Sequence, residues 1–291
     1  MVTPVGLGTW VFGGWPWNES SDKDSESALE AALDLGVCLI DTAPIYGCGR
    51  AERIIGRTLK RLKKRDDLIL SSKFGLCWEE GKRKKIWKDA SSKNLLREID
   101  DSLKRLETDR IDIYHLHWPD EKTPIGETME TLLLLKEKKK IGKIGLSNFN
   151  LSPLQEACRY APVEVLQVPY NYFARDIEKE ILPFCIEKNI VTLTYGTLCK
   201  GLLTGKFSGD KKPNDPVRNR SWDAIFAEEN YEKCLNEIET LKIKAAVENL
   251  TLAQWAIRWT MHQPGVTCAL IGARNAKQVR ENFTSLSQES S

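Results

Sequence analysis

Short apolar runs alternate with longer amphipathic stretches along most of the chain. The short runs are rich in Val, Ile and Leu, which is typical of strands buried on both faces of a sheet. They occupy residues 5–9, 37–41, 67–73, 111–117, 142–147, 165–168, 190–195 and 267–272. Because a stretch with helical spacing follows each run, the pattern predicts repeated strand–helix units and a parallel sheet.

The predicted helices gather their apolar residues on one face. Two such faces consist of Ala28, Leu29, Ala32 and Leu35 in residues 24–35, and of Leu95, Leu96, Ile99, Leu103 and Leu106 in residues 91–106. Further helices are predicted at residues 51–62, 124–139, 152–160, 177–188, 231–247, 251–261 and 275–283. Start signals support two of them, because Ser152 precedes Pro153 and Thr251 precedes an apolar stretch.

Eight strands alternating with helices favour a closed (β/α)8 TIM barrel. An open sheet that binds a dinucleotide usually carries G-x-G-x-x-G after its first strand. Here Val11 and Glu52 stand where the third glycine would follow the two candidate glycine pairs. The chain of 291 residues shows no low-complexity linker, so residues 1–291 are predicted to form one α/β barrel domain.

The composition is that of an ordinary soluble protein, with 41% hydrophobic and 29% charged residues. A net charge of +2 offers no basic excess for binding nucleic acid. No apolar run approaches the roughly 18 residues of a membrane helix, and no signal peptide is evident. The eight cysteines form no CxxC pair, which is typical of reduced thiols. We expect a cytoplasmic protein, either a monomer or a weak oligomer.

Polar residues stand at the ends of several predicted strands. They are Asp41, Lys73, His117 and Tyr195, with Ser147 and Asn148 after the fifth strand and Gln167 within the sixth. The carboxyl ends of barrel strands meet at one rim, where catalytic groups collect. A carboxylate, an ammonium, an imidazole and a phenol at the same rim therefore indicate a catalytic site.

The segment DTAPIYG at residues 41–47 adds a second phenol, Tyr46, to this rim. By itself the segment also fits a turn with a half-buried aromatic residue. A phenol with a pKa of about 10 donates protons slowly at neutral pH, and a nearby cation lowers that pKa. Lys73 would supply the cation, Asp41 would hold Lys73, and His117 would bind the substrate oxygen. Together, these four residues indicate a catalytic site that protonates a carbonyl oxygen.

Three other features allow competing interpretations. His115 and His117 share a strand face and could ligate zinc, as in a barrel hydrolase, but His262 is the only further histidine and lies in a helical stretch. We therefore expect no metal, and a core or loop position for His115. The basic runs at residues 81–89 and 136–140 fit a solvated loop and a helix end. Some of Trp15, Trp17, Trp78 and Trp118 are expected to line the substrate pocket.

Eight segments spread over nearly the whole chain match one known family in order. They are GLGTW (6–10), DTAPIYG (41–47), SKFG (72–75), IYHLHWPD (113–120), GLSNF (145–149), QVPYN (167–171), GLLTGK (201–206) and IGARNAKQVREN (271–282). On these motifs the chain resembles the aldo-keto reductases. The loop at 201–206 and the final motif are most similar to the bacterial-type and channel-β-subunit-like branches.

The resemblance implies an enzyme that reduces aldehydes or ketones with NADPH, with Tyr46 as general acid supported by Asp41, Lys73 and His117. It implies contacts to the nicotinamide and its ribose from Thr9, Trp10, Asp41, Ser147, Asn148, Gln167 and Tyr195. It implies contacts to the pyrophosphate from Gly196, Thr197, Leu198 and Lys206, with Arg218 assisting from an irregular loop. The adenosine end would be held by Gly272, Arg274, Gln278, Glu281 and Asn282.

The last motif has a physical logic that bears on the choice of cofactor. Residues 271–275 lead into a predicted helix, whose first amides and dipole attract anions. Arg274 adds a planar cation suited to a 2′-phosphate. NADPH is therefore expected in preference to NADH.

Three departures from the family qualify the resemblance. The sequence starts almost on its first strand, where relatives carry a hairpin that covers the bottom of the barrel. It ends soon after Asn282, which predicts an open site with broad substrate selection. Thr197 stands where many relatives have proline. An alternative function on the same fold is a cofactor-binding module that senses redox state with little turnover, although no extra domain or interaction tail favours it.

Overall fold

Eight parallel strands close into a barrel in the computed structural model, which describes residues 4–14, 17, 21–79, 82–209, 213, 217–218 and 224–283. The strands are β1 (Val5–Gly8), β2 (Leu39–Asp41), β3 (Ile69–Phe74), β6 (Ile111–Leu116), β7 (Ile141–Ser147), β8 (Val165–Pro169), β9 (Val191–Tyr195) and β10 (Cys268–Gly272). Neighbours follow the order β1-β10-β9-β8-β7-β6-β3-β2. The predicted (β/α)8 barrel is confirmed, with each strand found at its predicted place.

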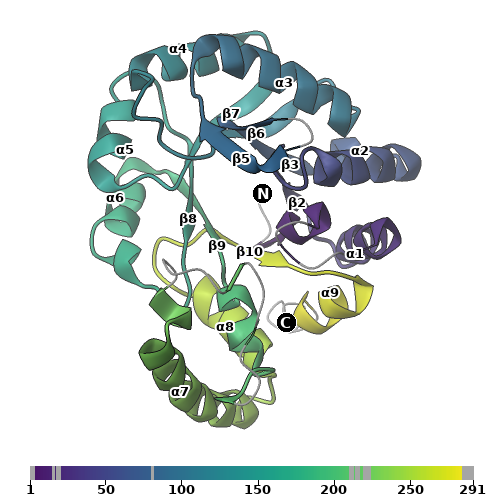
Figure 1. Cartoon of the computed structure of the whole chain (residues 1–291), viewed down its shortest axis with the longest axis vertical. Coiled ribbons are helices and arrows are strands. Elements are labelled where there is room, and N and C mark those ends of the chain that lie inside the picture. The colour runs from purple at the N-terminus through teal and green to yellow at the C-terminus, as the bar shows by residue number, and fades with distance from the viewer. Residues whose placement is uncertain are drawn as a thin grey trace.

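Helices surround the barrel (Figure 1). They are α1 (Asp22–Asp34), α2 (Arg50–Leu62), α3 (Ser92–Leu106), α4 (Ile125–Glu137), α5 (Leu151–Ala157), α6 (Ile181–Lys188), α7 (Glu228–Val247), α8 (Leu252–Met261) and α9 (Ala276–Phe283). Short 3-10 turns are η1 (Trp10–Gly13), η2 (Arg65–Asp67), η3 (Asp176–Glu178), η4 (Cys199–Thr204) and η6 (Ala224–Phe226). The single helix predicted at 177–188 is instead η3 followed by α6. In the described part of the chain, no helix combines the length and apolarity needed to cross a membrane.

One of the two predicted helix starts is confirmed. The Thr251 side chain accepts from the backbone N–H of Gln254, and the Gln254 side chain accepts from the backbone N–H of Thr251. The start predicted at Ser152 is wrong, because α5 begins at Leu151 after Asn150. Pro153 is tolerated slightly deeper in the first turn, where its missing N–H would have no partner within the helix.

The core consists of the barrel interior and the layer between strands and helices. Alternate strand residues fill the interior, among them Leu39, Ile113, Val165, Leu193, Cys268 and Leu270. The predicted helix faces are slightly too wide, since Leu35 at the end of α1 is 43% exposed and Leu96 in α3 is 39% exposed. Leu96 lies about 100° around the helix from the buried Leu95. A further cluster outside the barrel joins η4, α7 and α8.

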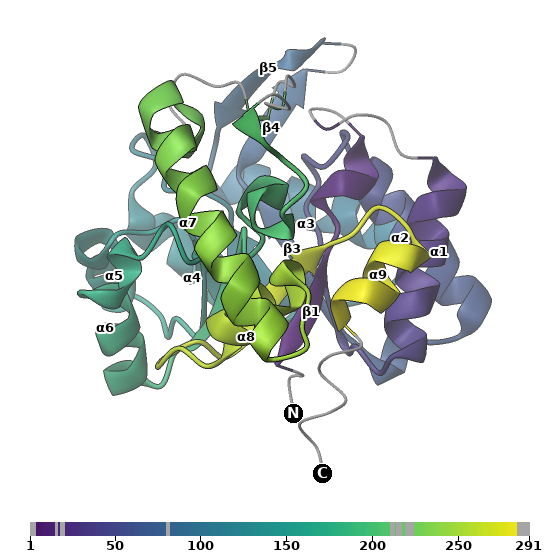
Figure 2. The same cartoon turned by 90° about the horizontal axis from the view of Figure 1, so that it is seen from below.

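A two-stranded hairpin extends the rim after β3. It pairs β4 (Leu76–Glu79) with β5 (Lys82–Lys88) in antiparallel register, with Cys77 opposite Trp87 and Trp78 opposite Ile86. Since β4 follows the carboxyl end of β3, the hairpin projects from the end of the barrel where catalytic groups are expected (Figure 2). The solvated loop predicted at 81–89 is therefore wrong for residues 82–88. Aromatic and apolar residues between the lysines support the pairing.

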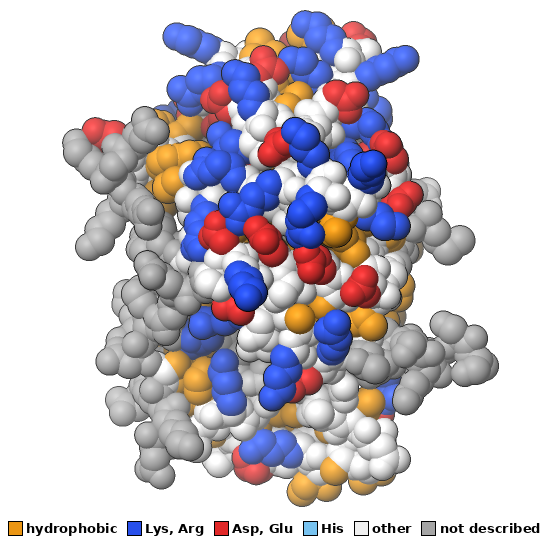
Figure 3. Space-filling view, turned by 90° about the vertical axis from the view of Figure 1, so that its right-hand side faces the viewer, with side chains coloured by type: hydrophobic (Ala, Val, Ile, Leu, Met, Phe, Trp, Pro, Cys, Tyr) orange, Lys and Arg blue, Asp and Glu red, His pale blue; other side chains and the backbone are white. Residues whose placement is uncertain are grey.

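Ion pairs connect the outer helices α1 and α2. Asp22 accepts from Arg50 and Arg57 at 2.6 and 2.7 Å, and Glu26 also pairs with Arg57. The face that carries these helices shows basic and acidic side chains intermingled (Figure 3). Such exposed pairs contribute little individually to stability. Because basic and acidic side chains are mixed over this face, neither charge is in strong excess there.

Candidate active site

Asp41 and Lys73 form a buried ion pair at the carboxyl end of the barrel. Lys73 Nζ donates to Asp41 Oδ2 at 2.7 Å and to the carbonyl oxygen of Thr42 at 2.8 Å. Asp41 Oδ1 accepts from Ser71 Oγ and from Gln167 Nε2, each at 2.8 Å. Because both carboxylate oxygens have partners, the pair is tolerated away from water. Three strands, β2, β3 and β8, thus meet at one carboxylate.

Tyr46 lies on the loop that follows β2, with its hydroxyl next to Lys73. Lys73 Nζ lies 3.3 Å from Tyr46 Oη, and 5.1 Å from the centre of its ring. The loop touches η1 backbone to backbone, since a Cβ placed on Gly47 would lie 2.2 Å from the carbonyl oxygen of Gly13. This close approach fixes the loop at the rim. The structure therefore brings Asp41, Tyr46 and Lys73 together.

The pKa shifts in this cluster differ from one sequence-based expectation. Burial raises the pKa of Tyr46 well above its ordinary value, and the Asp41 carboxylate raises it further. Lys73 does not lower it as expected, because Asp41 is in contact with the Lys73 ammonium and offsets its charge. Burial lowers the pKa of Lys73, while Asp41 opposes that shift. The phenol is accordingly protonated at neutral pH.

His117 lies just beyond β6, next to Tyr46. The two rings meet edge to face with their centres 6.0 Å apart. Burial and the charge of Lys73 lower the pKa of His117 well below its ordinary value. The imidazole is therefore neutral and carries one N–H that can donate a hydrogen bond.

His115 occupies a core position. It is fully buried, and its Nδ1 contacts the carbonyl oxygen of Leu146 at 3.4 Å. Burial lowers the pKa of His115 to about 4. Within the described ranges, no cluster of three or more His, Cys, Asp or Glu side chains is arranged to hold a metal ion.

The residues assigned to the nicotinamide surround this cluster. Thr9 Oγ1 donates to the carbonyl oxygen of Asp41 at 2.8 Å, and the Trp10 ring lies 6.3 Å from that of Tyr46. Asn148 Nδ2 donates to Ser147 Oγ at 3.1 Å and to the carbonyl oxygen of His117 at 2.9 Å. Tyr195 Oη donates to Asn148 Oδ1 at 2.7 Å. The amide of Gln167 is engaged by Asp41.

The rim after β9 and β10 exposes bare backbone. Gly196 is exposed with φ 75°, and a Cβ there would have no neighbour within 4 Å. Gly272 is also exposed, while Thr197 is buried with its hydroxyl 3.4 Å from the carbonyl oxygen of Leu270. Leu198 is half-buried. Open backbone of this kind lets a phosphate approach main-chain N–H groups, so the rim fits a pyrophosphate.

Arg218 and Lys206 converge on η4, beside that rim. Arg218 Nε donates to the carbonyl oxygen of Lys200 at 2.7 Å, and its guanidinium lies 5.0 Å from the ring of Trp17. A Cβ on Gly201 would lie 3.2 Å from Lys206 Nζ and 3.5 Å from Arg218 Nη2. From the sequence alone, Arg218 could not be placed relative to the other site residues. The structure puts it with Lys206.

The residues assigned to the adenosine end extend from the end of β10 at Gly272, through the turn at Arg274, into α9. The backbone N–H of Arg274 donates to Gln278 Oε1 at 2.9 Å, so the Gln278 side chain holds the turn before the helix. Glu281 is exposed and lies 3.7 Å from Lys277 Nζ. Glu281 and Asn282 are further along the helix. The structure thus joins Arg274 to Gln278, and Glu281 and Asn282 follow Gln278 at helical spacings of three and four residues on α9.

Sequence reasoning missed several contributors to the site. Ser71 bonds Asp41, and the backbone of Thr42 accepts from Lys73. Ser71 stands two residues before Lys73 on the same strand, so the two-residue period of strands would have placed both on the barrel interior. Trp17, which was among the tryptophans expected near the substrate pocket, links Trp10, at a ring distance of 5.1 Å, to Arg218. Trp15 lies outside the described residues.

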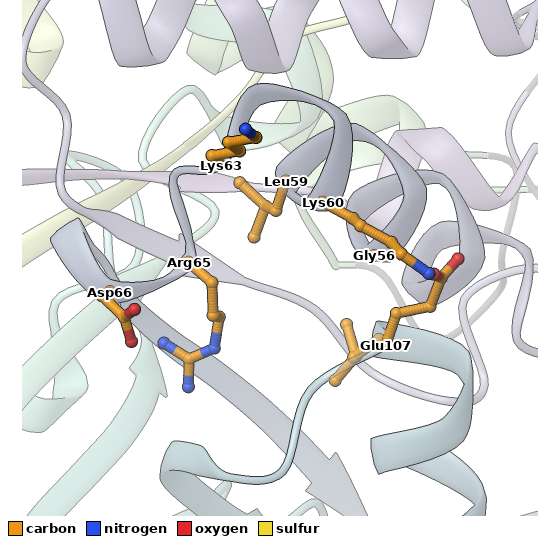
Figure 4. Close-up of a pocket in the computed structure, with 8 residues that line it drawn as sticks. Gly56, Leu59, Lys60, Lys63, Arg65, Asp66 and Glu107 are labelled. Carbon is orange, nitrogen blue, oxygen red and sulfur yellow. The ribbon is translucent and has the colours of Figure 1, made fainter.

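A separate cavity of about 250 Å³ lies between the ends of α2 and α3 (Figure 4). It is lined by Gly56, Leu59, Lys60, Lys63, Arg65, Asp66, Leu106 and Glu107. Lys60 pairs with Glu107 at 2.7 Å and Arg65 pairs with Asp112 at 2.9 Å. Helices of a (β/α)8 barrel run back from the carboxyl rim, so this cavity lies at the opposite end from Tyr46.

Comparison with known proteins agrees with the fold and the motifs. The model of the aldo/keto reductase family matches residues 4–291. Aldo-keto reductase YhdN of Bacillus subtilis is 40% identical, with 94% of this chain and 82% of that protein covered. The NADH-specific methylglyoxal reductase of Escherichia coli is 35% identical, with 98% and 90% covered. A probable voltage-gated potassium channel subunit beta of Arabidopsis thaliana is 32% identical, with 97% and 87% covered.

A solved structure shows the same architecture. The glycerol dehydrogenase AKR11B4 from Gluconobacter oxydans superposes with a TM-score of 0.89 at 39% identity, covering 97% of this chain and 86% of that one. The resemblance inferred from the motifs is thereby confirmed. The chain belongs to the aldo/keto reductase family.

Proposed function

We propose that this chain reduces small aldehydes or ketones to alcohols with NADPH, and that Tyr46 donates the proton. The observation that supports the proposal is the 3.3 Å contact between Tyr46 Oη and Lys73 Nζ inside a buried cluster anchored by Asp41. A protonated phenol beside a fixed ammonium is suited to charge that develops on a carbonyl oxygen.

Each residue of the cluster has a distinct task in this reaction. Reduced nicotinamide, when bound, supplies the hydride to the carbonyl carbon. Tyr46 gives its hydroxyl proton to the carbonyl oxygen, and the ammonium of Lys73 stabilises the phenolate that remains. Asp41 holds Lys73 in place and keeps it charged. The neutral imidazole of His117 donates a hydrogen bond that orients the substrate oxygen.

The cofactor assignment depends on the rim between β9 and β10 and on α9. Exposed backbone at Gly196 and Gly272 leaves room for the pyrophosphate. Arg274, at the start of α9, offers a guanidinium for the 2′-phosphate, and we therefore propose NADPH in preference to NADH. One relative is named as NADH-specific, so both nicotinamides have to be compared directly.

The assay follows the absorbance of reduced nicotinamide with a panel of aldehydes and ketones, in both reaction directions. Tyr46→Phe removes the proton donor and is expected to lower kcat by about 10²- to 10⁴-fold with NADPH binding retained. Tyr160→Phe is the matched control, because Tyr160 is 47% exposed and outside the site.

Two results would count against the proposal. Turnover by Tyr46→Phe at the wild-type rate would show that Tyr46 is not the proton donor. Tight NADPH binding by the wild-type protein without reduction of any carbonyl would instead favour the sensing module.

A further inference from the structure

The loop that carries Tyr46 runs directly into α2. The carbonyl oxygen of Tyr46 accepts from the N–H of Ala51 at 3.2 Å, and that of Pro44 accepts from Gly49 at 2.6 Å. Residues 47, 48 and 49 all have positive φ, at 66°, 53° and 83°. Few other conformations satisfy so tight a turn. The backbone at Tyr46 therefore follows the position of the first turn of α2.

Glu52 lies in that first turn and is fully buried. Its Oε1 accepts from Ser72 Oγ at 2.8 Å, and its Oε2 accepts from Arg105 Nε at 2.6 Å. Burial of a carboxylate is unfavourable unless its oxygens are paired. A residue held in this way is well suited to fix one element against another.

The two partners of Glu52 lie on elements that border the catalytic pair. Ser72 directly precedes Lys73 on β3, and strand alternation turns Lys73 into the barrel and Ser72 toward the helices. Arg105 comes from α3 and packs on the loop, since its Cδ lies 2.6 Å from the position of a Cβ on Gly49. Glu52 thus joins the helix after Tyr46 to the strand residue beside Lys73.

We propose that Glu52, held by Ser72 and Arg105, is a positioning residue that sets the separation of Tyr46 Oη and Lys73 Nζ. The inference rests on the proposed function, in which these two atoms deliver the proton. Any shift of α2 along β3 changes their 3.3 Å separation. Glu52 bonds Ser72 and Arg105 and positions the catalytic pair through the backbone. Its charge also raises the pKa of Lys73, so the test has to separate position from charge.

The test compares two buried serines on opposite sides of this network. Ser72 bonds Glu52, whereas Ser102 accepts from Arg105 Nη2 at 3.1 Å, and both side chains are fully buried. Ser72→Ala is expected to lower kcat by about tenfold to a hundredfold, with KM for NADPH unchanged. Ser102→Ala removes a similar hydroxyl and is expected to retain kcat within about twofold.

A second variant separates position from charge. Glu52→Asp keeps the negative charge but shortens the side chain by one methylene, so it cannot reach both partners. A role of charge alone predicts wild-type kcat for this variant. The positioning role predicts a loss as large as that of Ser72→Ala.

Crystal structures of the wild-type protein and Ser72→Ala supply a readout that does not depend on turnover. The separation of Tyr46 Oη and Lys73 Nζ is expected to exceed hydrogen-bond distance in the variant. The inference is overturned if this separation and kcat are both unchanged in Ser72→Ala, or if Ser102→Ala loses as much activity. If the wild-type protein reduces no carbonyl with either nicotinamide, the proposed function fails and the crystallographic separation alone decides the inference.

Discussion

Asp41 organises the candidate site, because a single carboxylate collects the side chains of Lys73, Ser71 and Gln167 from the barrel interior. Each bond is short and buried. Loss of Lys73 would remove the donor to Oδ2, whereas Oδ1 would keep one donor after loss of either Ser71 or Gln167. The carboxylate also raises the pKa of Tyr46 and opposes the lowering of the pKa of Lys73 by burial. One side chain thus influences both the geometry and the protonation of its neighbours.

Arg274 offers the sharpest prediction at the residue scale. Arg274→Ala is expected to weaken NADPH binding by about 10- to 100-fold and to leave NADH binding nearly unchanged, since only NADPH carries the 2′-phosphate. Lys277→Ala is the control, because Lys277 is an exposed cation three residues further along the chain, on α9. Titration of cofactor fluorescence measures both affinities. An equal loss for the two cofactors would contradict the assignment of Arg274.

The residues that form the site can be predicted from the sequence better than the shifts of their pKa values. Asp41 and Lys73 were predicted because each ionisable residue ends or follows an apolar strand. The upward shift of the Tyr46 pKa was not predicted. It depends on burial and on the contact between Asp41 and Lys73, which only the folded chain defines. Ser71 was missed although its spacing from Lys73 carried the signal.

Among the elements, the rim hairpin of β4 and β5 shows where sequence patterns mislead. Its second strand holds several lysines, and high charge is more often found in solvated loops. Cross-strand pairing with β4 overrides that preference, because backbone bonds and the residues between the lysines stabilise the hairpin. Lys88 Nζ also lies 5.8 Å from the ring of Trp118, which connects the hairpin to the residue after His117.

Helix α8 supports a prediction about element stability. Thr251→Ala removes a capping box and is expected to lower the free energy of unfolding by about 1 kcal/mol. Ser152→Ala is the control, because Ser152 lies within α5 and does not cap it. Urea unfolding of both variants measures the difference. Equal losses of unfolding free energy in the two variants would show that the Thr251 cap does not specifically stabilise α8.

For the whole molecule, regular strand–helix alternation made the barrel predictable. Closure brings residues distant in sequence together, as in the contact between Gln167 and Asp41. The cluster between η4, α7 and α8 could not be predicted, because it depends on how loops outside the repeated units pack. The position of Arg218 beside Lys200 likewise depends on a loop without periodicity.

Two buried histidines make stability depend on pH. Burial lowers the pKa of His115 to about 4 from an ordinary value of 6.5, and it also lowers the pKa of His117 well below its ordinary value. Below about pH 6.5 the unfolded chain binds protons that the folded chain does not, so the free energy of unfolding falls as pH drops toward 4. His115 contributes a slope of up to about 1.4 kcal/mol per pH unit between its two pKa values and none above them, and His117 acts in the same direction.

Urea unfolding at about pH 7 and about pH 5 measures this loss. His115→Gln is expected to reduce the difference between the two conditions, whereas the exposed His262→Gln leaves it as in the wild type. If both variants retain the full difference, buried His115 is not the source of the pH dependence.

The close approach of Gly13 and Gly47 has a consequence for engineering this protein. A side chain at either position would collide with the other's backbone, so neither can be changed without separating the segments that hold Trp10 and Tyr46. The hairpin of β4 and β5 carries no such restriction on its exposed residues Ile86 and Trp87. Libraries that aim to alter substrate range should randomise the hairpin and keep both glycines constant.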